Sequence, residues 1–296
     1  MDFTKKFIKT KRPCADGFRW FIKRYEVGGD YQTLLDELVE EGRIGDACWL
    51  MDQFGPTDAV REVDEIDAAA MVFAGSLVVK GNVQVDQLLR VGGTLTVGGG
   101  VRAGHDREPD VPSGFHVAND ARIEGGLDVM GDVVAGGSLK VGWGLQTQGT
   151  LQCQEDLTVG WALDCADEVN VGGNLKVGQE LQVQHDLRCG RSVHVKGPVS
   201  VNGHLTVGQG LLAFGDIHCQ MHLEAGWGVI SEGSILVGAS LRAGEGVRAA
   251  QTIDTGEGYG IYAGVAVHRE SWETSAQVQA SEKPSQLWSG HWVPNA

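Results

Sequence analysis

The chain has 296 residues, of which 44 are glycine, and a formal net charge of -15 at pH 7. Glycine is about twice as frequent as in an average protein, yet 42% of the residues are hydrophobic, which excludes a disordered or collagen-like chain. No apolar run approaches the ~20 residues that cross a bilayer, and lysines interrupt the first dozen residues, which argues against a secretion signal. We therefore expect a cytoplasmic protein with a turn-rich fold and no membrane contact.

Residues 1–70 predict a basic arm followed by a small helical cap. Residues 1–24 hold eight Lys or Arg and two Asp, whereas the remaining residues hold 16 basic and 37 acidic side chains. Such an arm can contact nucleic acid or anionic lipid, but it can equally be a solvated tail or lie on the protein's own acidic surface. Helices are predicted for 16–25, for 31–39 behind the N-cap residue Asp30, and for 46–54 before Gly55 and Pro56.

A six-residue period governs most of the remaining chain. From Leu127 to Ile253 every sixth residue is Leu, Ile or Val, and the residue two places later is small and mostly apolar. An earlier block, from Met71 to Ala103, keeps the same step. Between the blocks, 107–114 places eight residues, with two prolines, where six are expected, and predicts a loop at a corner.

Each six-residue unit predicts a three-residue strand followed by a corner, because side chains two apart in a strand point to the same face. Three sides of six residues make an 18-residue turn. The sequence thus predicts a mainly β, three-sided parallel β-helix (β-solenoid) of about 11 rungs over 71–270, with a cap at 1–70 and a C-terminal cap or tail at 271–296. Frequent glycine at the fifth place of a unit fits a bend that needs unusual backbone angles or close approach.

The repeat over 71–270 resembles two families. One is the left-handed hexapeptide-repeat family, whose resemblance implies a solenoid and, for many members, acyl transfer. The other is the bactofilins, whose resemblance implies a polymer-forming cytoskeletal solenoid. The pair Leu139-Lys140 and the fifth-place glycines depart from the hexapeptide pattern, so the handedness of the coil stays open.

Cysteine positions predict buried thiols. Four cysteines occupy the inward register, and those on one side lie two or three rungs apart, too far for a disulfide. We expect them to act as small hydrophobic residues in a reducing compartment. The four are Cys153, Cys165, Cys189 and Cys219, while Cys14 and Cys48 are expected to pack within the helical cap.

One side of the predicted coil carries no Lys or Arg. It comprises the eight units that start at 127, 145, 163, 181, 199, 217, 235 and 253. A face with one sign of charge attracts and selects a partner of the opposite charge, although carboxylates also serve solubility alone. The candidate binding residues on this side are Asp128, Asp132, Gln146, Gln148, Asp164, Glu168, Gln182, Gln184, Asp186, His204, His218, Gln220 and His222.

These features favour a non-catalytic binding protein whose acidic face blocks a basic protein, such as a nucleic-acid-handling enzyme or a toxin. Immunity proteins, anti-defence inhibitors and DNA mimics are of this type. Nucleic acid itself is not expected as the main ligand, because the acidic coil repels phosphates. No catalytic, cofactor or metal motif supports an enzyme. The alternatives are a self-assembling scaffold like the bactofilins, an oligomer of another kind, and an acyltransferase.

Overall fold

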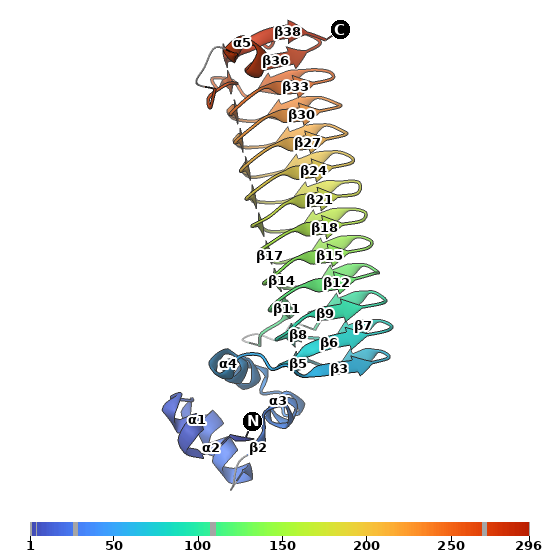
Figure 1. Cartoon of the computed structure of the whole chain (residues 1–296), viewed down its shortest axis with the longest axis vertical. Coiled ribbons are helices and arrows are strands. Elements are labelled where there is room, and N and C mark those ends of the chain that lie inside the picture. Colours follow the sequence, from blue (N-terminus) through green and yellow to red (C-terminus); the bar gives the residue numbers. More distant parts are fainter. Residues whose placement is uncertain (1, 4, 26–28, 107–110, 268–270, 296) are drawn as a thin grey trace.

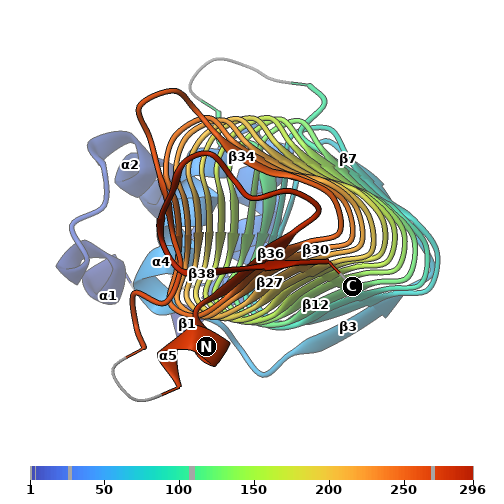
Figure 2. The same cartoon turned by 90° about the horizontal axis from the view of Figure 1, so that it is seen from above.

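The computed structural model describes residues 2–3, 5–25, 29–106, 111–267 and 271–295. It is a long rod of stacked coils with a group of helices at its N-terminal end (Figure 1). Viewed along the rod, the coil has three sides, and helices α1 and α2 project beyond its outline (Figure 2). A parallel β-solenoid with an N-terminal helical region was predicted, and both are confirmed.

The coil consists of three parallel sheets that share its interior. Sheet I contains β4 (Ile66–Ala68), β7 (Val83–Val85), β10 (Val101–Ala103), β13 (Leu127–Val129), β16 (Leu145–Thr147), β19 (Leu163–Cys165), β22 (Leu181–Val183), β25 (Val199–Val201), β28 (Ile217–Cys219), β31 (Ile235–Val237) and β34 (Ile253–Thr255).

Sheet II contains β5 (Met71–Phe73), β8 (Leu88–Val91), β11 (Gly114–Val117), β14 (Asp132–Ala135), β17 (Leu151–Cys153), β20 (Val169–Val171), β23 (Leu187–Cys189), β26 (Leu205–Val207), β29 (Leu223–Ala225), β32 (Leu241–Ala243), β35 (Ile261–Tyr262) and β37 (Leu287–Ser289).

Sheet III contains β3 (Val60–Val63), β6 (Ser76–Val79), β9 (Leu95–Val97), β12 (Ala121–Ile123), β15 (Leu139–Val141), β18 (Leu157–Val159), β21 (Leu175–Val177), β24 (Val193–Val195), β27 (Leu211–Ala213), β30 (Val229–Ser231), β33 (Val247–Ala249), β36 (Gln277–Ala280) and β38 (His291–Pro294).

The number of turns differs from the prediction. Sheet III has 13 strands, so the coil makes about 13 turns rather than 11. Strands β3 and β4 extend the coil before residue 71, and β36, β37 and β38 extend it after residue 270. A short helix, α5 (Trp272–Ser275), precedes β36. Residues 107–110 of the predicted corner loop lie outside the described residues, and β11 begins at Gly114.

Alternation along each strand builds the core as predicted. In β15, for example, Leu139 and Val141 are buried and Lys140 between them is exposed. Equivalent inward residues from Ile66 to Ala280 form one continuous apolar cluster. Burial of this interior drives folding, because each coil hides its apolar side chains against the coils on either side.

The corner glycines serve close approach rather than unusual backbone angles. Positive φ occurs at Gly104, Gly114, Gly258, Gly264 and Gly290 within the described coil, and at none of the regular fifth-place corners. At Gly149 an added Cβ would lie 2.4 Å from Oδ1 of Asp132, in the preceding turn. Of the two reasons that the sequence offered for glycine at these positions, unusual backbone angles or close approach, the structure supports close approach. The same close approach to an aspartate of the preceding turn recurs at Gly137, Gly173, Gly203 and Gly233.

Helices cover the N-terminal end of sheet II. Helix α1 (Lys5–Thr10) was not predicted, whereas α2 (Ala15–Arg24), α3 (Tyr31–Glu40) and α4 (Ile44–Phe54) were. The Asp30 carboxylate accepts a hydrogen bond from the Thr33 N–H and begins α3. Strands β1 (Asp2–Phe3) and β2 (Gly29–Asp30) form an antiparallel pair directly before it. Leu34, Leu35 and Leu38 pack in one cluster with Val72 and Leu88 of sheet II.

The side-chain amide of Gln32 covers the free edge of β5. Its Nε2 donates to the Val72 carbonyl (3.0 Å), and its Oε1 accepts from the Ala74 N–H (3.0 Å). The amide thus takes the place of the next strand's backbone. This contact stops further strand addition at a sheet end, which is otherwise open to pairing.

His116 is half-buried where the helices meet sheet II. Burial lowers its pKa, and so does the nearby Arg90 guanidinium, which pairs with Asp52 of α4, while the carboxylates of Asp132 and Asp52 act in the opposite direction. A lowered histidine pKa means that the unfolded chain binds more protons below about pH 6.5, so stability falls as the pH drops through that value.

We expect His116→Gln to flatten this dependence. Between pH 7.5 and 5.5 the urea midpoint of the wild type should fall, and that of the variant should fall less. His218, on the exposed surface of sheet I, supplies the control, because His218→Gln should keep the wild-type slope. An unchanged slope in His116→Gln would show that burial of this imidazole contributes nothing to acid sensitivity.

Candidate functional site

The outward surface of sheet I is a row of side chains, one from the middle of each strand, and all are polar except Leu236 of β31. Parallel pairing places Asp128 beside Gln146, Gln146 beside Asp164, and Asp164 beside Gln182. Ser200 and His218 continue the row. Of the 13 predicted binding residues, this row contains Asp128, Gln146, Asp164, Gln182 and His218.

The other eight predicted residues lie at the corner between sheets I and II. Gln148, Gln184 and Gln220 directly follow β16, β22 and β28 of sheet I, and Gln184 Oε1 accepts from Asn202 Nδ2 (2.6 Å). The remaining residues stand at or directly before the start of a strand of sheet II, and they are Asp132, Glu168, Asp186, His204 and His222. The structure thus divides the predicted site between a flat face and a corner.

Two of the corner carboxylates cap backbone groups of the next coil. Oδ1 of Asp132 accepts from the Thr150 N–H (2.8 Å), and Oδ1 of Asp186 accepts from the His204 N–H (2.9 Å). The same contact, always 18 residues apart, recurs at the other corners, where Asn82, Asp120, Asp156 and Asp216 are the acceptors. The N–H of Asn174 holds the pKa of Asp156 below its usual value. Asp132 and Asp186 therefore have structural contacts as well as exposed surface.

Cations reach the predicted cation-free side from two directions. Arg188, on sheet II, pairs with Asp186 (2.8 Å) and with Glu168 (3.7 Å). Arg102, on β10 of sheet I itself, lies 3.9 Å from Asp128. Arg102 could not be assigned to this side from the sequence, because the longer connection before β11 breaks the regular step between β10 and β13, which nevertheless pair. In the described row from β13 to β34, Asp164 and, five strands further along, Asp254 are the carboxylates that have no ion pair with Lys or Arg.

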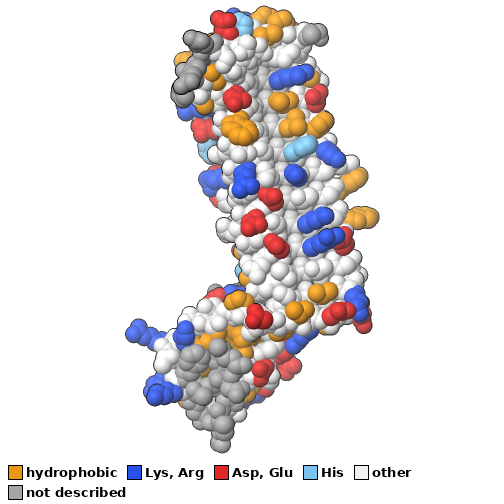
Figure 3. All heavy atoms as spheres, in the orientation of Figure 1, with side chains coloured by type: hydrophobic (Ala, Val, Ile, Leu, Met, Phe, Trp, Pro, Cys, Tyr) orange, Lys and Arg blue, Asp and Glu red, His pale blue; other side chains and the backbone are white. Residues whose placement is uncertain are grey.

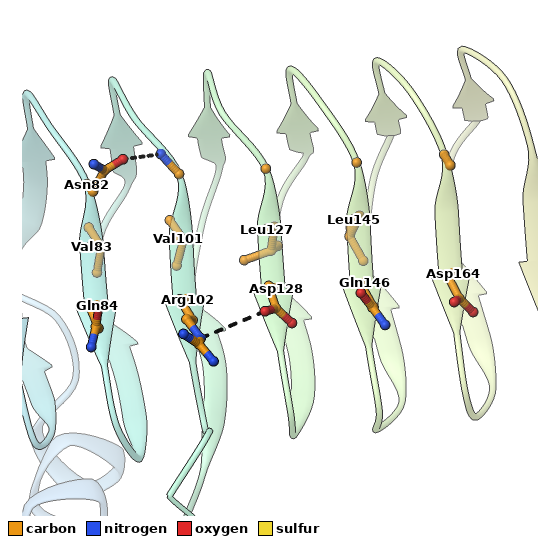
Figure 4. Close-up of a pocket in the computed structure, with 14 residues that line it drawn as sticks. Asn82, Val83, Gln84, Val101, Arg102, Leu127, Asp128, Leu145, Gln146 and Asp164 are labelled. Carbon is orange, nitrogen blue, oxygen red and sulfur yellow. Dashed lines mark hydrogen bonds and ion pairs between the residues drawn. The ribbon is translucent and has the colours of Figure 1, made fainter.

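A shallow groove of about 600 Å³ runs across the first half of this face. Figure 4 shows Gln84, Arg102, Asp128, Gln146 and Asp164 side by side along it. At the corner between sheets III and I, the residue directly before each of four neighbouring strands of sheet I is small, which leaves the groove open, and these residues are Gly100, Gly126, Gly144 and Ala162. Backbone and row side chains are therefore both accessible to a docked partner.

Two exposed tryptophans flank the same corner. Trp143 and Trp161 directly precede Gly144 and Ala162, and they are 71% and 57% exposed. A large aromatic side chain in water is a frequent anchor for a partner. By contrast, sheet III, which faces the viewer in Figure 3, carries basic side chains among acidic and apolar ones, including Arg122, Lys140 and Lys176.

The histidines of the corner are stacked on one another. The rings of His204 and His222 lie parallel with centroids 5.4 Å apart, and Tyr259 meets His222 edge-on at 5.7 Å. His222 Nδ1 also accepts from the Ser240 N–H (3.2 Å). Among the described residues there is no group of three His, Cys, Asp or Glu that could hold a metal ion.

The inward cysteines are free and buried, as predicted. Each thiol donates to the carbonyl of a residue 16 positions earlier, for example Cys153 to Gly137 (3.3 Å) and Cys165 to Gly149 (3.4 Å). Thr147 makes the same contact with Gly131 (2.7 Å). Burial raises the pKa of Cys165 and Cys219 to about 11. These thiols therefore make weak polar contacts inside the coil, and their burial disfavours the thiolate form.

No helix in the described part of the chain is long and apolar enough to cross a membrane.

The helical region at the N-terminal end is similar to a known domain. Residues 1–54, which span α1 to α4, match the family model of the YdhT N-terminal domain. No curated protein and no solved structure matches the chain. The helical segment is thus similar to this domain, and the resemblance of the coil to hexapeptide-repeat proteins and bactofilins rests on its repeat alone.

Proposed function

We propose that the protein is a non-catalytic binding rod that docks a basic protein partner along sheet I. One observation carries the proposal: from β13 to β34 no Lys or Arg side chain stands on the outward side of this sheet. Arg122, Lys140 and Lys176 stand on sheet III, and Arg188 and Arg242 on sheet II. A basic surface would therefore meet least repulsion on sheet I.

The chemistry of the face suits protein recognition. Its row alternates carboxylates with amides at Asp128, Gln146, Asp164 and Gln182, so that Lys or Arg and backbone groups of a partner both find acceptors. The open corner and the exposed Trp143 and Trp161 add apolar area at one edge. Inhibition of a nucleic-acid-handling enzyme or a toxin is the use that we infer for such a surface.

The ends of the rod favour a discrete particle over a filament. Gln32 occupies the edge of β5. At the other end, the N–H groups of His291 and Asn295 point toward β36. Because backbone groups alternate in direction along a strand, those of Trp292 and Pro294 point toward the free edge of β38. Proline has no N–H to donate to an added strand.

Charge reversal on sheet I tests the proposal. Asp164→Lys is compared with Glu224→Lys, which makes the same change in the middle of a strand on sheet II. Asp186 is left unchanged because it caps the His204 N–H. We expect proteins captured by the wild type and by Glu224→Lys to be captured at least tenfold less by Asp164→Lys, as measured by quantitative mass spectrometry. Equal capture by all three would contradict docking on sheet I.

A further inference from the structure

The helical region contains an apolar cavity that the binding face does not use. It has a volume of about 190 Å³ and lies among helices α1 to α4. Its walls include Trp20 and Phe21 of α2, Leu34 and Leu38 of α3, and Trp49 and Leu50 of α4. An empty space of this size leaves its lining atoms without dispersion contacts, and cavities of about 150 Å³ lined by Leu, Ile and Phe take up benzene. The cavity is thus large enough for an aromatic ring.

Contacts outside the cavity hold one of its aromatic walls in place. The guanidinium groups of Arg24 and Arg43 lie 5.2 and 5.9 Å from the Trp20 ring centroid. The indole N–H of Trp20 donates to Glu41 Oε2 (2.5 Å). Because these contacts fix the ring from outside, Trp20 is held as a wall and does not turn inward to fill the space.

Asp46 is the one charged side chain among the described lining residues. Its Oδ2 pairs with Arg43. Its Oδ1 has a long contact with the Cys14 thiol (3.5 Å), which leaves it able to accept a stronger hydrogen bond. Gly17 lies between these two groups, and a Cβ there would stand 3.1 Å from Cys14 Sγ and 3.3 Å from Asp46 Oδ1. Aromatic walls and one acceptor together define the ligand.

We propose that this cavity binds a small planar aromatic molecule that carries one N–H or O–H donor. The ring packs between Trp20, Trp49 and Phe21, and the donor meets Asp46 Oδ1. The site lies within the segment that matches the YdhT N-terminal domain, so it does not depend on the proposed docking of a partner on sheet I.

Indole is the probe, titrated into the full chain by calorimetry. We expect saturable binding with one site per chain. Leu38→Phe should fill the cavity and weaken binding at least tenfold, whereas Val39→Phe, on the same helix but outside the lining, should bind as the wild type does. Benzofuran, which has the same shape without the N–H, should bind several-fold more weakly than indole because it cannot donate to Asp46.

Cys14 reports on occupancy without any mutation. It is the one exposed cysteine of the six, the other five being buried, so iodoacetamide should modify it first. Saturating indole should slow this alkylation, as followed by intact-protein mass spectrometry. This measurement decides the question even if Leu38→Phe does not fold.

Three results would overturn the proposal. The first is no saturable binding of indole at millimolar concentration. The second is indole binding outside the cavity. It would be shown by indole binding that does not protect Cys14, or by a folded Leu38→Phe variant that binds indole as tightly as the wild type does. The third is equal binding of indole and N-acetyltryptophanamide, which would assign the cavity to a partner's tryptophan side chain instead of a small molecule.

Discussion

Replacing Phe115 with alanine is expected to lower the free energy of unfolding by about 4 kcal/mol, in the range for a buried phenylalanine truncated in a core. Phe115 is fully buried in β11 and is the largest of the fully buried side chains. It stacks between Leu89 and Val133 of the neighbouring coils. Its removal would leave a cavity bounded by main chain that the sheet ladder prevents from closing. Urea unfolding followed by circular dichroism measures the loss.

Phe115→Leu is the matched control. Leucine occupies the equivalent inward position of sheet II at Leu89 and Leu151, so the coil accepts this shape. The cost should be about 1 kcal/mol, because leucine keeps most of the buried apolar volume that alanine removes. If alanine and leucine cost the same, the cavity argument would be wrong at this site.

Gly137→Ala should also destabilise the coil, by about 3 kcal/mol, because it combines crowding with the loss of a hydrogen bond. An added Cβ would lie 2.3 Å from Oδ1 of Asp120, and that oxygen accepts the Ser138 N–H at 2.7 Å. The methyl group therefore displaces a carboxylate from a backbone donor and crowds the corner at once. The change in urea midpoint measures the effect.

A double-mutant cycle with Asp120→Ala separates the two causes. Without the carboxylate, the nearest atoms to the new Cβ are backbone atoms at 3.0 Å, a contact that small shifts relieve. Gly137→Ala should then cost less in the Asp120→Ala background than in the wild type, by about 1 kcal/mol or more. Additive effects would mean that the glycine is required by the backbone alone.

The regular part of the fold could be predicted because each strand repeats the same alternation of inward and outward residues. The ends of the coil could not. Val278 of β36 pairs with Val247 of β33, an interval much longer than a regular turn. Trp292 of β38 pairs in turn with Val278, an interval shorter than a regular turn. Parallel pairing tolerates connections of different length between the sides, so a search for a fixed period loses these strands.

For the candidate site, the sequence predicts which side chains point outward but not which of them have partners. Alternation placed Asp128, Gln146 and Asp164 outward, and the structure has them in one row. Whether a carboxylate accepts a hydrogen bond or forms an ion pair depends on groups of the neighbouring turn, which are distant in sequence. Asp186 accepts a hydrogen bond from the His204 N–H, and Glu168 lies 3.7 Å from Arg188 of the next coil.

The sequence nevertheless contains a signal for the corner carboxylates that accept a backbone N–H of the next turn. At the capped corners an Asp or Asn is matched by a glycine one position short of a full turn later, as Asp120 is by Gly137 and Asn82 by Gly99. The glycine is needed because the capping oxygen occupies the space of a Cβ. This pairing could have separated structural carboxylates such as Asp186 from free ones before the structure was known.

The pairing of a corner carboxylate with a glycine of the next turn has a consequence for how such a rod can change length. Asp120 with Gly137, Asp132 with Gly149 and Asp156 with Gly173 each join one turn to the next. Losing or duplicating a whole turn brings a new acceptor and a new glycine together in the same geometry, whereas any other length of insertion in a strand separates them. Related chains should therefore differ in length by whole turns, and irregular insertions should be confined to corners such as the one before β11.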